Sequence, residues 1–146
     1  MISTIGVTKA GTGLDGIAWN VVGHTYRPVF RSKDAFVWSA VMPAGTFVPP
    51  HIHPLQDEWL TLMSGEMDVE IGDGKLTATT GDTIRLPRGI AHGLFNRSGG
   101  ETTAVFGVAP TGKLFDLFAA LHGVSDPQEL VSLSAAHDVQ FLPPKP

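Results

Sequence analysis

The sequence predicts an all-β domain, either a sandwich or a small barrel, that is followed by two helices. Short β-prone segments follow one another from Trp19 to Val108 with no helical pattern between them, which is typical of this fold class. The 17 glycines and 11 prolines are spread along the chain and indicate many turns. With 146 residues the chain is long enough for one domain with a hydrophobic core, but not comfortably for two.

The β-prone segments predict the barrel itself, over about residues 17–109. Each segment is bounded by Gly, Pro, Asn or Asp. Asp73 and Gly74 separate two of them, and Asp-Gly is a preferred loop for a tight hairpin. The segments are WNVVG (19–23), AFVWSAVM (35–42), EWLTLMSG (58–65), EMDVEIG (66–72), KLTATT (75–80), TIRLP (83–87), HGLFN (92–96) and TAVFGVA (103–109).

The character of the sequence changes after Pro110, and two helices are predicted over about residues 111–146. Asp126 is a candidate N-cap for the second helix, with Pro127 at its first position and Glu129 at its third. We expect both helices to pack outside the β-domain or against a second subunit, and the proline-rich tail FLPPKP to be irregular. The first helix is predicted by an apolar face, ended by Gly123, that consists of Leu114, Phe115, Leu117, Phe118 and Leu121.

The composition excludes several classes of function. A net charge of −4 provides no basic face, so we expect neither a nucleic-acid partner nor electrostatic binding to a membrane. No apolar stretch approaches the roughly 20 residues that span a bilayer. The absence of cysteine rules out disulfides, thiolate catalysis and sulfur-ligated metals, and it suits an intracellular chain. Because MISTIGVTKAG does not have the pattern of a signal peptide, we expect a cytoplasmic protein.

The segment PPHIHPLQDEW (49–59) contains two of the six histidines in the chain, and one residue separates them. In an extended strand, His51 and His53 would point to the same face. Glu58 has the wrong parity for that face, but Pro54 and the polar residues after it favour a turn, after which Glu58 could point inward. Either the histidines are polar residues of an ordinary strand, or they are part of a metal-binding constellation with Glu58.

A regular pattern of glycines and a second block of residues favour the metal site. The first block reads G-x5-H-x-H-x4-E-x6-G and runs from Gly45 to Gly65. The second block, GDTIRLPRGIAHGLFN (81–96), reads G-x5-P-x-G-x2-H-x3-N. Its fixed positions are Gly81, Pro87, Gly89, His92 and Asn96.

Both blocks resemble the two signature motifs of the cupin superfamily without departure, and the 15 residues between them fit the spacing of small bacterial cupins. The rest of the chain is loosely similar to single-domain cupins that are described as quercetin-dioxygenase-like. The resemblance implies one cupin domain over residues 1–146, a double-stranded β-helix or jelly-roll barrel of two antiparallel sheets. It also implies that one metal ion is held inside this barrel by His51, His53, Glu58 and His92.

Elementary physical chemistry is consistent with these motif roles. Gly45, Gly65 and Gly81 stand where tight turns need a positive φ or a close approach of the backbone. The segment from Pro87 to Gly89 can bend the chain so that the following histidine enters the barrel. Asn96 could order the turn by hydrogen bonding, and we expect its role to be structural.

Apolar residues near the motifs are candidates for a substrate pocket. If Glu58 points inward, Leu60 and Leu62 share its face and would line an apolar interior. In AFVWSAVM both faces look buried, so Trp38 could line the pocket or serve as a core or interface aromatic.

The other histidines and two arginines are weaker candidates. His24, His122 and His137 have no ligand-like spacing, and we expect them to be surface or structural residues. Arg85 and Arg88 flank the second motif and could bind an anionic substrate, but solvated surface charge is the simpler interpretation.

The leading functional hypothesis is a metal-dependent oxygenase that acts on a small enol or catechol-like substrate. Three imidazoles and one carboxylate leave coordination positions open for ligands. Glu58 could be both a ligand and a general base for the substrate hydroxyl. The ion could be iron, manganese, cobalt, nickel, copper or zinc. The alternatives are a redox-neutral isomerase, lyase or hydrolase, and a non-catalytic module that binds a small molecule.

We expect a homodimer, because small cupins commonly pair their barrels. The N-terminal segment TIGVTKAG (4–11) and the apolar face of the first predicted helix are both candidate contact elements, and the sequence does not choose between them.

Overall fold

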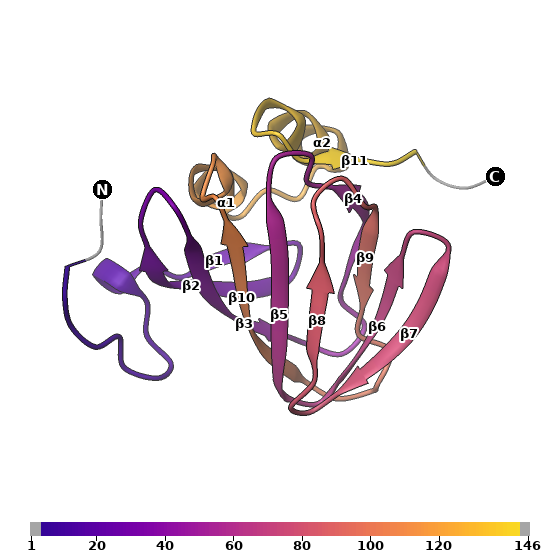
Figure 1. Cartoon of the computed structure of the whole chain (residues 1–146), viewed down its shortest axis with the longest axis horizontal. Helices are drawn as coiled ribbons and strands as arrows, with labels where there is room; N and C mark the ends of the chain where they lie inside the picture. The colour runs from indigo at the N-terminus through magenta and orange to yellow at the C-terminus, as the bar shows by residue number, and fades with distance from the viewer. Residues whose placement is uncertain (1–3, 144–146) are drawn as a thin grey trace.

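The computed structural model of the protein describes residues 4–143, and these residues form two antiparallel sheets and two helices (Figure 1). Both helices lie outside the sheets at one end of the barrel, at the top of the view in Figure 1. This arrangement confirms the predicted all-β fold with two C-terminal helices.

Within the described residues, one sheet has six strands and the other has five. The order of the first sheet is β1 (Trp19–Val21), β2 (His24–Arg31), β3 (Phe36–Met42), β10 (Thr102–Ala109), β5 (Asp57–Ser64) and β8 (Thr83–Leu86). The order of the second sheet is β11 (Gln140–Phe141), β4 (Phe47–Ile52), β9 (His92–Phe95), β6 (Glu66–Ile71) and β7 (Gly74–Thr79). A short 3-10 turn, η1 (Leu14–Gly16), precedes β1.

The two helices are α1 (Leu114–Leu121) and α2 (Pro127–Ala136), close to the predicted positions. The Asp126 side chain caps α2 by accepting a hydrogen bond from the Gln128 amide at 3.1 Å. Among the described residues, neither helix is long and apolar enough to cross a membrane. The buried face of α1 consists of Leu114, Leu117, Phe118 and Leu121.

The buried face of α1 decides between the two candidate dimer contacts. Because this face packs against its own chain, it is not available to a second copy. In the N-terminal segment, by contrast, Ile5 and Val7 are fully or largely exposed. The N-terminal segment is therefore the remaining candidate, and dimerisation itself stays a prediction.

Three strands lie where the sequence pattern did not predict a separate strand. Pro28 interrupts the pattern of β2, and the register between β2 and β3 shifts there. Pro49 and Pro50 lie in β4, where the register with β9 also shifts. Proline cannot donate to a ladder of backbone hydrogen bonds, so such irregularities are where a strand tolerates it.

The third of these strands, β11, includes Phe141, the first residue of the tail that was expected to be irregular. Gln140 pairs with Ile52 and Phe141 with His51, at the edge of the second sheet. The Leu142 amide also donates to the Pro50 carbonyl at 3.0 Å. The rest of the predicted irregular tail beyond residue 143 lies outside the described residues.

The predicted hairpin forms, but its turn is shifted by one residue. Ile71 and Gly74 are cross-strand partners, so the two loop residues are Gly72 and Asp73 rather than Asp73 and Gly74. Gly72 has a φ of 56°, which favours glycine at this position.

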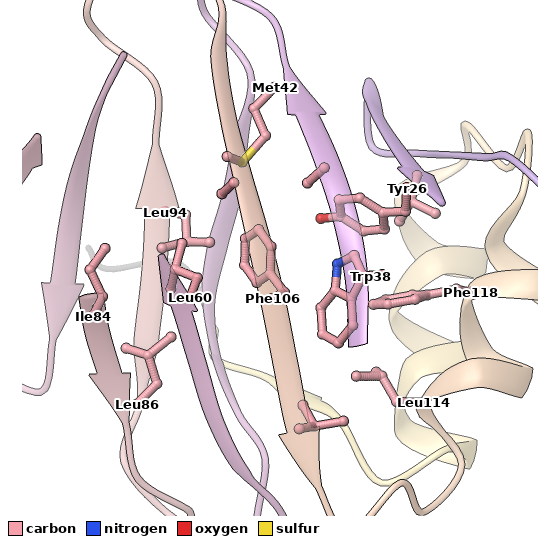
Figure 2. Close-up of a cluster of buried hydrophobic side chains, with 14 of the residues drawn as sticks. Tyr26, Trp38, Met42, Leu60, Ile84, Leu86, Leu94, Phe106, Leu114 and Phe118 are labelled. Carbon is pink, nitrogen blue, oxygen red and sulfur yellow. The ribbon is translucent and has the colours of Figure 1, made fainter. Parts of the chain in front are cut away.

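The hydrophobic core continues from the barrel to the underside of α1 (Figure 2). Trp38 of β3 stacks on Phe106 of β10, with ring centroids 5.1 Å apart. Phe118 of α1 packs edge-on against Trp38 at 5.0 Å. Aromatic pairs of this kind contribute about 0.5–1.5 kcal/mol each beyond the burial of their area. The core therefore holds α1 over the end of the barrel.

Candidate metal centre

Four buried side chains converge inside the barrel at the end that the helices cover. They are His51 in β4, His53 just after β4, Glu58 in β5 and His92 at the start of β9. One ligand atom from each residue lies within 4.8 Å of the other three. The structure thus brings together all four residues that the two motifs identify, while the binding of a metal there stays a prediction.

Strand pairing and one turn determine how these side chains meet. His51 and His92 are direct cross-strand partners in β4 and β9, and their ring centroids are 4.4 Å apart. The rings of His53 and His92 are almost parallel, with centroids 5.5 Å apart. Glu58 comes from the opposite sheet, after the turn that follows His53, and it is buried. In an unbroken strand Glu58 would point to the face opposite the two histidines. The turn interrupts the alternation and lets Glu58 point inward, as the sequence suggested.

The second motif also supports the first by a backbone contact. Gly89 donates its amide hydrogen to the carbonyl oxygen of His53 at 3.0 Å. Its φ of 79° lies in the left-handed region, where a side chain would be strained. The turn that begins at Pro87 therefore holds the backbone of His53 as well as leading the chain into His92.

Asn96 links the two motifs. It is almost fully buried, and its amide donates to the carbonyl oxygens of Met42 and Gly100, both at 2.9 Å. Its backbone carbonyl accepts a hydrogen bond from the Gly45 amide at 2.9 Å. These contacts order the turns beyond β3 and β9. The other motif glycines, Gly45, Gly65 and Gly81, all have positive φ angles.

The hydrogen bonds of the histidines leave the correct nitrogen free for a metal. Nδ1 of His51 lies 2.8 Å from the carbonyl oxygen of Pro49. Because a carbonyl oxygen only accepts hydrogen bonds, Nδ1 carries the proton and Nε2 keeps its lone pair. Burial lowers the pKa of His51 well below its usual value, and the neighbouring His92 and His53 lower it further. Burial also lowers the pKa of His92. Both imidazoles are therefore neutral at pH 7, which is the form that binds metals.

Gln56 is a functional residue that the sequence did not identify. Its Nε2 donates to the carbonyl oxygens of Pro110 at 3.0 Å and Thr111 at 2.7 Å. These bonds turn its Oε1 toward Nδ1 of His53, which donates to it at 3.0 Å. Gln56 thereby leaves Nε2 of His53 free for a metal. The only signal in the sequence was a polar residue three positions after a ligand histidine, in a turn where polar residues are ordinary.

The donor set fits a divalent transition metal. Nε2 of His53 lies 3.1 Å from Oε1 of Glu58, and Nε2 of His92 lies 3.7 Å from the same oxygen. Within residues 4–143, both ring nitrogens of His92, Nδ1 and Nε2, are buried and have no hydrogen-bond partner. Imidazole nitrogens and carboxylate oxygens are ligands that such ions accept, and the four ligand atoms lie close enough together to hold one ion.

A cavity of about 60 Å³ adjoins the cluster. His51, His53 and Glu58 line one end of it, and mostly apolar side chains from both sheets and the C-terminal segment line the rest. Phe141 of β11 is one of these, and its ring lies 5.3 Å from the ring of His51. The sequence did not predict this wall, because it depends on long-range packing of α1, α2 and β11 against the barrel.

Of the three residues predicted to line a pocket, one lines the cavity and two do not. Trp38 lies in the cavity wall. Leu60 and Leu62 share the inward face of Glu58, but they do not line this cavity and belong to the core. Each step of two residues along a strand moves a side chain by about 7 Å, which carries them away from the metal-binding end.

The remaining histidines do not join the cluster. His24 is fully buried, and burial lowers its pKa to about 4. His122 and His137 lie just after α1 and α2 and contact the backbone. The partner atoms are the Tyr26 hydroxyl at 3.0 Å from His24, the Asn20 amide at 2.8 Å from His122 and the Leu133 carbonyl at 2.7 Å from His137.

The two candidate arginines lie on the surface. Arg88 forms an exposed two-point contact with Asp57, with two nitrogen–oxygen distances of 3.2 Å. This arginine holds the pKa of the Asp57 carboxyl below its usual value. Arg85 is exposed on β8. Neither side chain lines the cavity.

Known proteins resemble this chain in both sequence and fold. The family described as "Cupin domain" matches residues 38–108. Germin-like protein 9-1 of Oryza sativa subsp. japonica is 33% identical over 111 residues, which cover 68% of this chain and 44% of that protein. Oxalate oxidase GF-2.8 of Triticum aestivum is 28% identical over 137 residues, which cover 63% of this chain and 61% of that protein. The chain thus spans about half of the length of these relatives.

A solved structure supports the same fold. An RmlC-like cupin from Shewanella frigidimarina NCIMB 400 superposes with a TM-score of 0.68 at 16% identity. The match covers 79% of this chain and 99% of that one. Two facing antiparallel sheets, the match of residues 38–108 and this superposition lead to one conclusion: the chain belongs to the cupin superfamily.

Proposed function

We propose that the protein is a metal-dependent enzyme, an oxygenase that acts on a small substrate with enol or catechol-like oxygen atoms. One observation carries this proposal. Three imidazoles and one carboxylate converge beside a largely apolar cavity, and His51, His53 and Glu58 help to line it. An ion that takes five or six ligands keeps open positions beside these four, which distinguishes a centre that can act on ligands from a closed structural one.

A divalent transition metal bound here would supply Lewis-acid activation of a substrate oxygen and, if the ion is redox-active, electron transfer with dioxygen. His51, His53 and His92 would act as ligands through Nε2. Glu58 lines the cavity beside them, so its carboxylate can also accept a proton from a substrate hydroxyl. The apolar walls exclude water, which strengthens the electrostatic interactions at the centre.

One relative supports an oxidative reaction. The wheat protein, which is 28% identical over 137 residues, is named as an oxalate oxidase. The reaction of this chain is inferred from its own donor set and cavity, because that relative is distant.

The decisive experiment combines elemental analysis with oxygen uptake. Protein purified without chelators is analysed for iron, manganese, cobalt, nickel, copper and zinc, and oxygen consumption is then followed with catechol and small enolisable ketones. A redox-active ion with substrate-dependent oxygen uptake supports the proposal. Bound zinc without oxygen uptake would instead indicate a redox-neutral isomerase, lyase or hydrolase. Protein that binds these compounds but takes up no metal would indicate a non-catalytic binding module.

A further inference from the structure

The cavity beside the metal centre is small and almost free of charge. Its volume of about 60 Å³ has room for about five water molecules. Apart from the residues of the centre, its lining is apolar except for Tyr26, Trp38 and Ser134. Among the described residues, no lysine, arginine, asparagine or glutamine lines it.

The charges around this cavity limit the ligand that it can hold. A divalent ion, the carboxylate of Glu58 and three neutral imidazoles together carry one positive charge. A monoanionic ligand makes this centre neutral, whereas a dianion leaves a net negative charge in a space with little water, which is costly. The nearby ionisable groups do not offset this negative charge. Burial raises the pKa of Tyr26 and lowers that of His24 to about 4, so both are uncharged at pH 7.

Two hydrogen-bond donors in the wall lack partners. Nε1 of Trp38 and Oγ of Ser134 are buried and have no hydrogen-bond partner within residues 4–143. Ser134 is the buried residue of α2, at a position where a helix packed on an apolar wall usually has an apolar side chain. A buried polar group without a partner is unfavourable, so a bound molecule that accepts these hydrogen bonds is stabilised.

We infer that the cavity binds a compact ligand with a single negative charge, which lies on its metal-binding oxygen atoms, such as a keto acid or an enolate, and that Trp38 and Ser134 donate hydrogen bonds to it. Dicarboxylates are excluded by charge. The inference rests on the proposed metal centre for the binding of these oxygen atoms. The wall of the cavity and its two donors do not depend on that centre.

Pyruvate and oxalate form a matched pair that tests the charge limit. They have the same number of non-hydrogen atoms and chelate in the same way, but a methyl group of pyruvate is replaced by a charged oxygen in oxalate. Calorimetry measures the affinity of the metal-loaded protein for pyruvate and for oxalate. Each value is divided by the affinity of the free metal ion for the same compound in the same buffer. We expect the normalised affinity for pyruvate to be at least tenfold higher. An equal or higher normalised affinity for oxalate would overturn the inference.

Two variants test the donors. Ser134→Ala and Trp38→Phe remove one donor each, and each should weaken pyruvate binding about three- to tenfold. Ser132→Ala on the exposed side of α2 and Trp59→Phe on the outside of β5 are the matched controls. Pyruvate affinities that are the same in all four variants would overturn the assignment of the donors. Thermal unfolding of each variant verifies that it is folded.

A binding measurement on metal-free protein separates this inference from the proposed function. Butane-2,3-dione is uncharged and has the size of pyruvate, and ligand-observed NMR detects its weak binding to protein without metal. Stronger binding to the wild type than to Ser134→Ala would support the cavity assignment even if the protein proves to hold no metal. Equal binding to the two proteins would overturn it, whatever the enzymatic activity.

Discussion

Among single residues, Glu58 is proposed to be both a metal ligand and a general base, and one substitution can separate these two roles. Glu58→Gln keeps the size of the side chain and a ligand oxygen, but the amide cannot accept a proton. We therefore expect turnover to fall about 10²- to 10⁴-fold, while metal content falls much less. Metal content and steady-state rates are compared in the same preparation, with the exposed Glu66→Gln as a control. A variant with full turnover would exclude the base role.

Gln56 would influence metal binding through its hydrogen bond with His53. Gln56→Leu removes the acceptor for Nδ1 of His53 and leaves the carbonyl oxygens of Pro110 and Thr111 without this donor. Loss of a partner that orients a ligand histidine typically weakens metal binding about 10- to 100-fold. Competition with a chelator measures this effect, and Gln128→Leu on the exposed start of α2 is the matched control. Equal metal affinity in the two variants would show that Gln56 does not orient His53.

The four residues of the cluster could be predicted from the sequence, but Gln56, which contacts His53, could not. His51, His53, Glu58 and His92 stand at fixed spacings because the strands and turns between them have fixed lengths. Gln56 carries no such pattern, since its burial depends on the β10–α1 junction that packs over it. Sequence patterns report periodicity along the chain, whereas this contact joins residues 54 and 55 positions apart.

At the scale of elements, β11 closes the metal-binding end of the barrel. Phe141→Ala removes a half-buried ring beside His51 and opens the cavity wall. We expect the free energy of unfolding to fall by about 2 kcal/mol, less than for a fully buried phenylalanine. Chemical denaturation measures this change, with Leu142→Ala, which is more exposed, as the control. If the two variants were equally stable, β11 would not contribute to the wall.

Three strands, β2, β4 and β11, could not be predicted from the sequence pattern. Short β-prone segments bounded by turn residues predicted β3, β5 and β10, and in the structure each of these strands buries mainly one face. The patterns of β2 and β4 are interrupted by prolines that the structure places at register shifts. For β11, two residues are too few for any periodicity, and the strand exists only through its pairing with β4.

At the scale of the whole molecule, buried histidines make the stability depend on pH. Burial lowers the pKa of His24 to about 4 in the folded protein, against about 6.5 in an unfolded chain. Between these values the unfolded chain binds a proton that the folded protein does not. The free energy of unfolding therefore decreases as the pH falls from about 6.5 to about 4, by about 3 kcal/mol from this group. His51 and His92 act in the same direction.

Denaturation of metal-free protein at a series of pH values tests this dependence. His24→Gln should give a shallower decrease than the wild type, whereas the exposed His122→Gln should not. The Tyr26 hydroxyl, which faces His24 at 3.0 Å, remains uncharged over this range. An unchanged slope in His24→Gln would assign the acid sensitivity to other groups.

Elemental analysis shows whether His51, His53, Glu58 and His92 hold one divalent transition metal. Wild-type protein, His53→Ala and His92→Ala are each purified without chelators, with His137→Ala as a control outside the cluster. We expect about one ion per chain in the wild type and the control, and a large loss in both cluster variants. A wild type without metal, or cluster variants that retain as much metal as the wild type, would show that the cluster does not bind a metal.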